Sequence, residues 1–453
     1  MKINYVELAE IDYSRRKKLT ERPNVDLRNL MPQVVPIIED VKLRGDIALA
    51  YYTQKFDHAQ ITSDNFWVSK LTMRQALENI APSFREAMEK SIDNINKFHN
   101  FQKEPDSREI EIMPGIVAGE RTIPLSSVGL YIPRGKGSFP SMMIMAAVPA
   151  KVAGVKRIVA VSPPDKFGKA DEATLAAAAL IGVDEFYTVG GPQAIAALAY
   201  GTKTIKAVDK IVGPGSGYVL AAKQWLSTEI ETGLPAGPSE AIVLADGFVS
   251  AITAATDLLI EAEHGPDSSA YLVTPDVRLA QEALNVLPEL VRNLPEQRRL
   301  YCETVLLNSG GIIVAADMHD AIRFINEFAP EHLQVLTANP RDILEKIITA
   351  GETLLGAFTP GSLANYSIGP NAILPTSGFG RTASALSVRD FTRKMSFAEV
   401  TKEGFSSIAP GALALARYEG FAAHAAALVH RLGPDYEHSE ELQQRVGEKV
   451  CLS

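Results

Sequence analysis

Residues 158–201 read IVAVS (Ile158–Ser162), then EATLAAAALIG (Glu172–Gly182), EFYTVGG (Glu185–Gly191) and PQAIAALAYG (Pro192–Gly201). Short β-branched runs that end near glycine and precede Ala-rich segments are typical of buried parallel strands joined by helices. The alternation continues in four further predicted strands, KIVGPG (Lys210–Gly215), AIVLADG (Ala241–Gly247), AYLVT (Ala270–Thr274) and GIIVAAD (Gly311–Asp317). The sequence therefore predicts an α/β fold whose parallel sheets carry helices on both faces.

The length of 453 residues exceeds what one hydrophobic core holds, which is about 250–300 residues. Together with the number of strand–helix repeats, this predicts two α/β domains. Residues 24–101 and the segment after Leu386 show helical apolar spacing instead, and the segment after Leu386 is expected to form a C-terminal appendage.

The composition, with 46% hydrophobic and 22% charged residues, is that of a soluble globular protein. We find no apolar run of about 18 residues and no signal-peptide pattern at the start, so we expect no membrane association and a cytoplasmic location. The two cysteines, Cys302 and Cys451, also suit a reducing compartment. A net charge of −9 argues against a nucleic acid partner.

Two glycine-rich stretches are candidates for a nucleotide phosphate. GLYIPRGKGSFPS (Gly129–Ser141) carries Arg134 and Lys136 among its glycines, and IVGPGSGYV (Ile211–Val219) lies between a predicted strand and a predicted helix. Such loops let backbone amides approach a phosphate, and ligands of α/β sheets gather at the carboxyl ends of strands. Neither is a complete dinucleotide fingerprint, so a tight structural turn is an equally good interpretation of each.

Three segments carry histidine and carboxylate side chains. On a helix, Glu261 and His264 would share one face, a spacing that suits two ligands of one metal, although a capped surface helix is the commoner case. Glu331 and His332 are an adjacent pair of proton acceptors, or else an acidic helix start. His424 falls on an Ala-rich helix side that looks packed, where it needs a polar partner or a metal.

In these motifs the sequence resembles the histidinol dehydrogenase family. The resemblance runs nearly end to end and rests on segments such as VGLYIPRG, VGGPQAIAALAYGT, KIVGPGSGYV, LPAGPSEAIVLAD, AEHGPDS, APEHL and EGFAAHA. It implies a homodimeric enzyme with one zinc ion per subunit. Such an enzyme oxidises an amino alcohol to the acid in two NAD-dependent steps through a held aldehyde.

The resemblance also implies a division of the chain. Residues 1–26 would form an N-terminal arm, residues 27–129 with 240–385 a first Rossmann-like domain, and residues 130–239 a second. Residues 386–453 would form an appendage that is exchanged across the dimer and completes the partner's site.

Residue roles follow from the resemblance position by position. Glu331 matches the base that activates water in the second oxidation, and His332 matches the base of the first. The zinc ligands match Glu261, His264, Asn365 and His424, and these four residues and His332 would also contact the substrate. Further substrate contacts match Ser239 and Glu419. The NAD contacts match Tyr131, Gln193 and Ser216. Since neither cysteine lies near a base or a glycine loop, activated water is favoured over a thiol nucleophile.

Six positions depart from the family pattern. Glu261 stands where the family usually has Gln, and Asn365 where it has Asp, so the formal charge of the expected zinc site is unchanged. Ala372 replaces a substrate-contacting His, Ser216-Gly217 replaces Asn-Arg, and Arg134 replaces a Gly of the first loop. These changes keep two alternatives open beside a histidinol dehydrogenase. One is a paralogue that oxidises another amino or hydroxy alcohol, and the less favoured one is an inactive binding homologue.

Overall fold

The structure is a computed structural model that describes residues 1–22, 27–135 and 137–433. It contains two compact units. Unit 1 comprises Met1–Lys103 and Pro124–Thr392, and unit 2 comprises Glu104–Ile123 together with the chain from Arg393 onward. Lys136 and Cys451 lie outside the described residues. Within the described part of the chain, no helix is long and apolar enough to cross a membrane.

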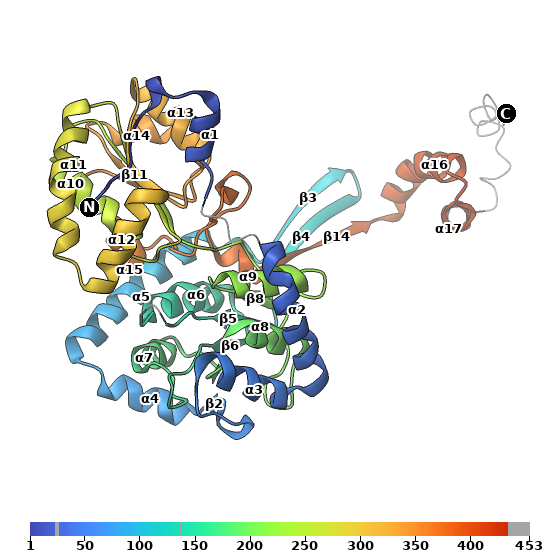
Figure 1. Ribbon diagram of the computed structural model, residues 1–453. Coiled ribbons are helices and arrows are strands. Elements are labelled where there is room, and N and C mark those ends of the chain that lie inside the picture. The colour runs from blue at the N-terminus through green and yellow to red at the C-terminus, as the bar shows by residue number, and fades with distance from the viewer. Residues whose placement is uncertain (23–26, 136, 434–453) are drawn as a thin grey trace. The chain divides into compact units, whose positions relative to one another are not determined.

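The first sheet of unit 1 is parallel throughout and lies between two layers of helices (Figure 1). Its spatial order is β1 (Tyr5–Glu7), β11 (Gly310–Val314), β10 (Ser269–Thr274), β9 (Glu240–Ala245), β12 (His332–Leu336) and β13 (Glu352–Leu355). One face shares a hydrophobic core with α10 (Ala251–Ala262), α11 (Val277–Arg292) and α12 (Glu296–Asn308). The other face is covered by α1 (Tyr13–Leu19), α13 (Met318–Phe328) and α14 (Pro340–Leu344).

The second sheet of unit 1 has the order β2 (Trp67–Val68), β7 (Glu185–Tyr187), β6 (Arg157–Val161), β5 (Ser127–Tyr131) and β8 (Lys210–Val212). Only β2 runs antiparallel to its neighbour. Its two cores contain α4 (Lys70–Asn79), α5 (Pro82–Gln102), α6 (Pro140–Ala153) and α7 (Glu172–Ile181) on one face and α2 (Leu27–Arg44), α3 (Asp46–Asp57), α8 (Gly191–Tyr200) and α9 (Gly217–Leu226) on the other. The strand order reverses at β5, because β6 and β7 lie on one side of it and β8 lies on the other, and such a switch point is where α/β sheets bind ligands.

Unit 2 is a small sheet followed by two helices. The sheet has the order β14 (Thr392–Val400), β4 (Ile116–Pro124) and β3 (Ser107–Met113), and the helices are α16 (Lys402–Tyr418) and α17 (Ala422–Leu432). The backbone amide of Thr401 donates to the carbonyl of Gly115, which ties the start of α16 to the β3–β4 hairpin.

The predicted α/β fold with two parallel sheets is confirmed, and each of the six quoted strand segments contains a strand. The predicted division of unit 1 differs from its packing. Residues 27–129 are predicted to belong to the domain of residues 240–385, but α2, α3, α4 and α5 pack on the second sheet, and the boundary at residue 129 falls inside β5. The reason is that β5 pairs with β6 and β8, which no local pattern reveals.

Candidate active site

Glu331 and His332 lie at the beginning of β12, at the amino edge of the first sheet. The alternative interpretation of this segment as an acidic helix start is wrong, because His332 begins a strand that pairs with β9 and β13. Ala329 has a φ of 53°, a left-handed conformation that is rare for a residue with a side chain. This turn directs the chain from the end of α13 into β12.

The two side chains are buried and each has a fixed partner. Glu331 Oε2 accepts a hydrogen bond of 2.9 Å from the backbone amide of Glu240, which is the first residue of β9. His332 Nδ1 lies 2.6 Å from Oε1 of Glu352, the first residue of β13. The remaining nitrogen of His332, Nε2, lies 3.7 Å from Oε1 of Glu331. An acid and an imidazole are therefore held side by side, each by a neighbouring strand.

Their proton affinities are strongly shifted. Burial raises the pKa of Glu331 to about 8, against the opposing effect of His332. Burial lowers the pKa of His332, but the carboxylates of Glu261, Glu331 and Glu352 outweigh it and raise that pKa to about 10. Buried clusters of titratable groups whose pKa values are shifted far from their usual values are typical of sites of proton transfer.

A second cluster combines Glu261, His264, Asn365 and Ser239. Glu261 is almost fully buried at the end of α10, and its Oε1 accepts a 2.9 Å hydrogen bond from Asn365 Nδ2 on α15 (Gly361–Tyr366). His264 Nδ1 lies 2.9 Å from both Ser239 Oγ and Glu261 Oε2. The structure thus brings together three of the four expected metal ligands and the expected substrate contact Ser239.

The donor set suits a divalent cation. Glu261 Oε2 accepts no hydrogen bond of normal geometry from the residues that the structure describes, although it is buried. The positive charges of His264 and His332 outweigh burial and hold the pKa of this carboxyl well below its usual range, so it is ionised. Among the described residues no group of three His, Cys, Asp or Glu side chains forms a metal site by itself. A zinc ion here would need the amide oxygen of Asn365 and a further ligand.

The expected NAD contacts lie at the carboxyl edge of the second sheet, where its strands lead into α6, α8 and α9. The hydroxyl of Tyr131, at the end of β5, accepts a 3.1 Å hydrogen bond from the amide of Gly191. Gln193 is fully buried in α8, and neither polar atom of its side chain has a partner in the described part of the chain. Ser216 is the residue that precedes α9, and its side chain makes no capping bond.

Gly213 explains why the second loop needs glycine. Its φ is 115°, and a Cβ at this position would lie 2.2 Å from the carbonyl oxygen of Tyr131. The second glycine loop therefore packs directly on the end of β5, which also begins the first loop. Both loops meet at the switch point of the sheet, as a nucleotide site requires.

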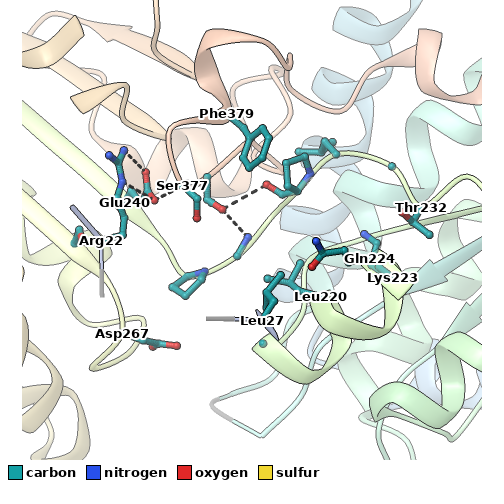
Figure 2. A pocket seen from close by; sticks show the side chains of 18 of the residues that line it. Arg22, Leu27, Leu220, Lys223, Gln224, Thr232, Glu240, Asp267, Ser377 and Phe379 are labelled. Atoms are coloured by element: carbon teal, nitrogen blue, oxygen red, sulfur yellow. Dashed lines mark hydrogen bonds and ion pairs between the residues drawn. The ribbon is translucent and has the colours of Figure 1, made fainter. Parts of the chain in front are cut away.

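A cavity of about 600 Å³ in unit 1 lies between these two edges (Figure 2). One wall contains Glu240 and Ser269 from the first sheet, and another contains Gly217 and Lys223 from α9. The cavity is lined by Glu240, whose backbone amide donates to Glu331, and by Gly217, which follows Ser216, whereas Glu331 and His332 themselves do not line it. It has the volume of a small-molecule site.

Glu419 and His424 belong to unit 2. Glu419 follows α16, and His424 lies on α17 with its ring 5.1 Å from that of Phe421. The prediction that His424 lies on a packed helix side is wrong for the chain by itself, because α17 contains no buried residue. An Ala-rich face does not tell whether its own chain or another covers it.

The structure also shows the surroundings of Arg134, Ala372 and Cys302. Arg134 donates to the carbonyls of Lys169 at 2.6 Å and Pro163 at 3.4 Å, so its guanidinium braces a neighbouring loop. Ala372 is buried in the apolar core that also contains α6. Cys302 is a buried free thiol in α12 whose pKa burial raises to about 12, which agrees with a structural role.

The sequence patterns assign no role to two residues of this site, Glu240 and Glu352. Each is an acidic residue that opens an otherwise apolar run, in SEAIVLA and GETLLG. Buried charges are rare without a partner, so an acid at the start of a fully buried strand was the available signal.

The comparisons with known proteins agree with this geometry. The family model described as histidinol dehydrogenase matches residues 20–432. A protein named histidinol dehydrogenase from Synechocystis sp. is 48% identical over 94% of this chain and 98% of its own length. A histidinol dehydrogenase homolog from Colwellia psychrerythraea is 47% identical over 95% of this chain and 96% of its own length.

A solved structure gives the same result. The crystal structure of histidinol dehydrogenase from Elizabethkingia anophelis superposes with a TM-score of 0.90 at 36% identity, over 96% of this chain and 99% of that one. With a matching family model, relatives near half identity and a shared fold, this chain belongs to the histidinol dehydrogenase family.

Proposed function

We propose that the protein oxidises L-histidinol to L-histidine in two NAD-dependent steps through the aldehyde. The observation that supports this most is the buried pair Glu331 and His332. In this pair, His332 Nδ1 is hydrogen-bonded to Glu352 and His332 Nε2 lies near the Glu331 carboxyl group. A two-step oxidation needs two proton acceptors at one reacting carbon, and this pair supplies them.

In the first step, His332 takes the proton of the substrate hydroxyl while the carbon loses a hydride. In the second step, Glu331 takes a proton from the water that adds to the aldehyde carbon, and the hydrate then loses its hydride. Tyr131, Gln193 and Ser216 would hold NAD, which when bound would supply the hydride acceptor for both steps. The first oxidation therefore yields one NADH and one proton, and the second yields one NADH and two protons, because the carboxylic acid formed ionises.

Glu261, His264 and Asn365 would hold zinc, with His424 of the partner subunit as the fourth ligand. The support is the carboxylate–imidazole–amide set itself, in which the buried Glu261 Oε2 lies 2.9 Å from His264 Nδ1 and accepts no hydrogen bond of normal geometry from the described residues. When bound, zinc would orient and polarise the substrate oxygen. The charge of Glu261 is also one of the carboxylate charges that raise the pKa of His332. Offsetting its charge would leave His332 more readily neutral, as a base must be.

The tail is proposed to exchange across a homodimer, so that Glu419 and His424 complete the partner's substrate site. The support is the surface of unit 2. Leu415 is 66% exposed, Tyr418 is 84% exposed, and α17 buries none of its residues. Apolar side chains in such a series are normally covered in an assembly. The free thiol Cys302 supports the proposed cytoplasmic location.

The second candidate function is the oxidation of a different amino or hydroxy alcohol. It is favoured by Ala372, which lies in an apolar core where the family has a substrate-contacting His. Without the hydrogen bond of that imidazole, the pocket should bind histidinol more weakly by about 1–3 kcal/mol. An inactive homologue is disfavoured, because Glu331 and His332 keep two well-placed partners in Glu240 and Glu352.

The test separates the two oxidations by supplying either the alcohol or the aldehyde. Glu331→Gln should spare alcohol oxidation and slow aldehyde oxidation by about 10²–10⁴-fold, because an amide cannot accept the proton of water. His332→Asn should slow alcohol oxidation by a factor in the same range. Equal losses in both steps for both variants would refute the assignment.

A further inference from the structure

Arg22 connects the N-terminal segment to the acid–base site. Its Nε and Nη2 bond Oε1 and Oε2 of Glu240 at 3.1 and 2.9 Å, as drawn in Figure 2. Nη2 also donates to the carbonyls of Phe328 at 2.5 Å and Ala329 at 3.1 Å, and Nη1 donates to the carbonyl of Thr20 at 2.7 Å. The guanidinium further stacks on the ring of Phe328, 3.8 Å from its centre.

Two of the residues that Arg22 contacts, Glu240 and Ala329, also fix the position of Glu331. Glu240 donates its backbone amide to the Glu331 carboxylate. Ala329 lies two residues before Glu331 and has the strained left-handed backbone, and Arg22 binds the carbonyl of that same residue. A strained conformation of this kind persists only where its surroundings fix it.

We propose that Arg22 is a positioning residue for Glu331. It ties the start of β9 to the turn after α13, so that the carboxylate meets water and the aldehyde carbon in one orientation. Arg22 can act in this way only if Glu331 has the role proposed above. His332 is held separately by Glu352 from β13, so the first oxidation should depend on Arg22 much less.

Arginine is needed because several acceptors surround one planar group. The Glu240 side chain is 3% exposed, so its charge requires a partner, and a guanidinium serves this carboxylate and two carbonyls together. A lysine ammonium keeps the positive charge but cannot reproduce the planar, two-pronged arrangement of N–H donors that a guanidinium presents. Arg22→Lys therefore preserves the ion pair while it loosens the turn.

Arg16 provides a matched control. It belongs to the same N-terminal segment and also binds α13, through Asp320 at 2.8 Å and Glu327 at 2.7 Å. These hydrogen bonds join other residues of α13 and involve neither Glu240 nor the turn at Ala329. A general loss of anchoring by the segment should therefore affect Arg16→Lys and Arg22→Lys alike, whereas a positioning role should affect only the second.

The experiment measures both oxidations, by NADH formation from the alcohol and from the aldehyde, in the full-length variants. Arg22→Lys should lower kcat of aldehyde oxidation by about 10- to 100-fold, with alcohol oxidation and the KM for the aldehyde within about threefold of the wild type. Arg16→Lys should leave both steps within the same range. In a Glu331→Gln background, Arg22→Lys should cause no further loss of aldehyde oxidation, because the group that it positions is already absent.

Equal losses in the two oxidations, or a full additional loss in the Glu331→Gln background, would overturn the positioning role. So would unchanged aldehyde oxidation in Arg22→Lys. These outcomes are distinct from a failure of the proposed function, in which Glu331→Gln itself would not single out the second step. If Arg22→Lys does not fold, Arg22→Ala combined with Glu240→Gln removes the charge pair together and undergoes the same comparison.

Discussion

Replacing Glu352 with Gln should impair the first oxidation in two separable ways. Glu352 Oε1 lies 2.6 Å from His332 Nδ1, and its side chain is only 9% exposed. The substitution keeps the shape of the side chain and removes its charge. The limiting rate of alcohol oxidation should fall because the imidazole loses the carboxylate that fixes its orientation and tautomer.

The magnitude follows from this one interaction. A hydrogen bond to a charged group contributes about 1.5–3 kcal/mol, which corresponds to roughly 10- to 150-fold in rate. The pH profile should shift as well. A base works in its deprotonated form, so alcohol oxidation rises with pH through the pKa of His332, and Glu352 is one of the carboxylates that raise this pKa. Without that charge the rising limb should move to lower pH.

The assay is the steady-state rate of NADH formation from the alcohol across a range of pH. Asp257→Asn is the matched control, because Asp257 Oδ2 accepts a 2.6 Å hydrogen bond from Gln334 on the same strand as His332. It should change neither the limiting rate nor the position of the limb. A Glu352→Gln enzyme with the wild-type rate and an unmoved limb would refute the orienting role of Glu352.

Three further outcomes are expected. Protein purified without chelator should contain about one zinc ion per subunit, and Glu261→Ala should lose it; less than about a tenth of an ion, with no gain on adding zinc, would contradict the site. Ala372→His should raise kcat/KM for L-histidinol by roughly 5- to 150-fold, and no gain would show that the pocket seats this substrate without position 372. Equal amounts of Glu331→Gln and His424→Ala subunits, when mixed, should recover about a quarter of the wild-type aldehyde oxidation, since half of the dimers are then mixed and one of the two sites in each is intact; no recovery would contradict the exchanged tail.

Strands and helices are predictable from the sequence wherever the local pattern of apolar residues and turn residues fits only one kind of element. IVAVS and AIVLADG were recognised as strands because apolar β-branched runs ending in turn residues have few other structures. HLQVL in β12 was missed, because a proline and two ionisable residues precede its apolar part. Ligands were expected at the carboxyl ends of strands, yet Glu331 and His332 lie at the amino edge of the first sheet.

The sequence predicts which residue types form the site, but it does not predict the hydrogen bonds and ion pairs between them. Glu331 and His332 are neighbours in the chain, and their motif was visible. Glu240 is 91 residues away from Glu331, and it became a partner only through the pairing of β9 with β12. The role of Arg22 depends on a tertiary contact in the same way, since it spans 218 residues to Glu240. Such contacts depend on sheet register, which a single sequence does not specify.

The most direct test of the central claim is the stoichiometry and efficiency of L-histidinol oxidation by the wild-type protein. Two proton acceptors at one carbon predict two NADH for each L-histidinol consumed, with L-histidine as the product and kcat/KM at or above about 10⁴ M⁻¹s⁻¹. One NADH per substrate with released aldehyde would contradict the paired roles of Glu331 and His332. No turnover of L-histidinol, beside efficient two-step oxidation of another alcohol, would contradict the proposed substrate and establish the paralogue.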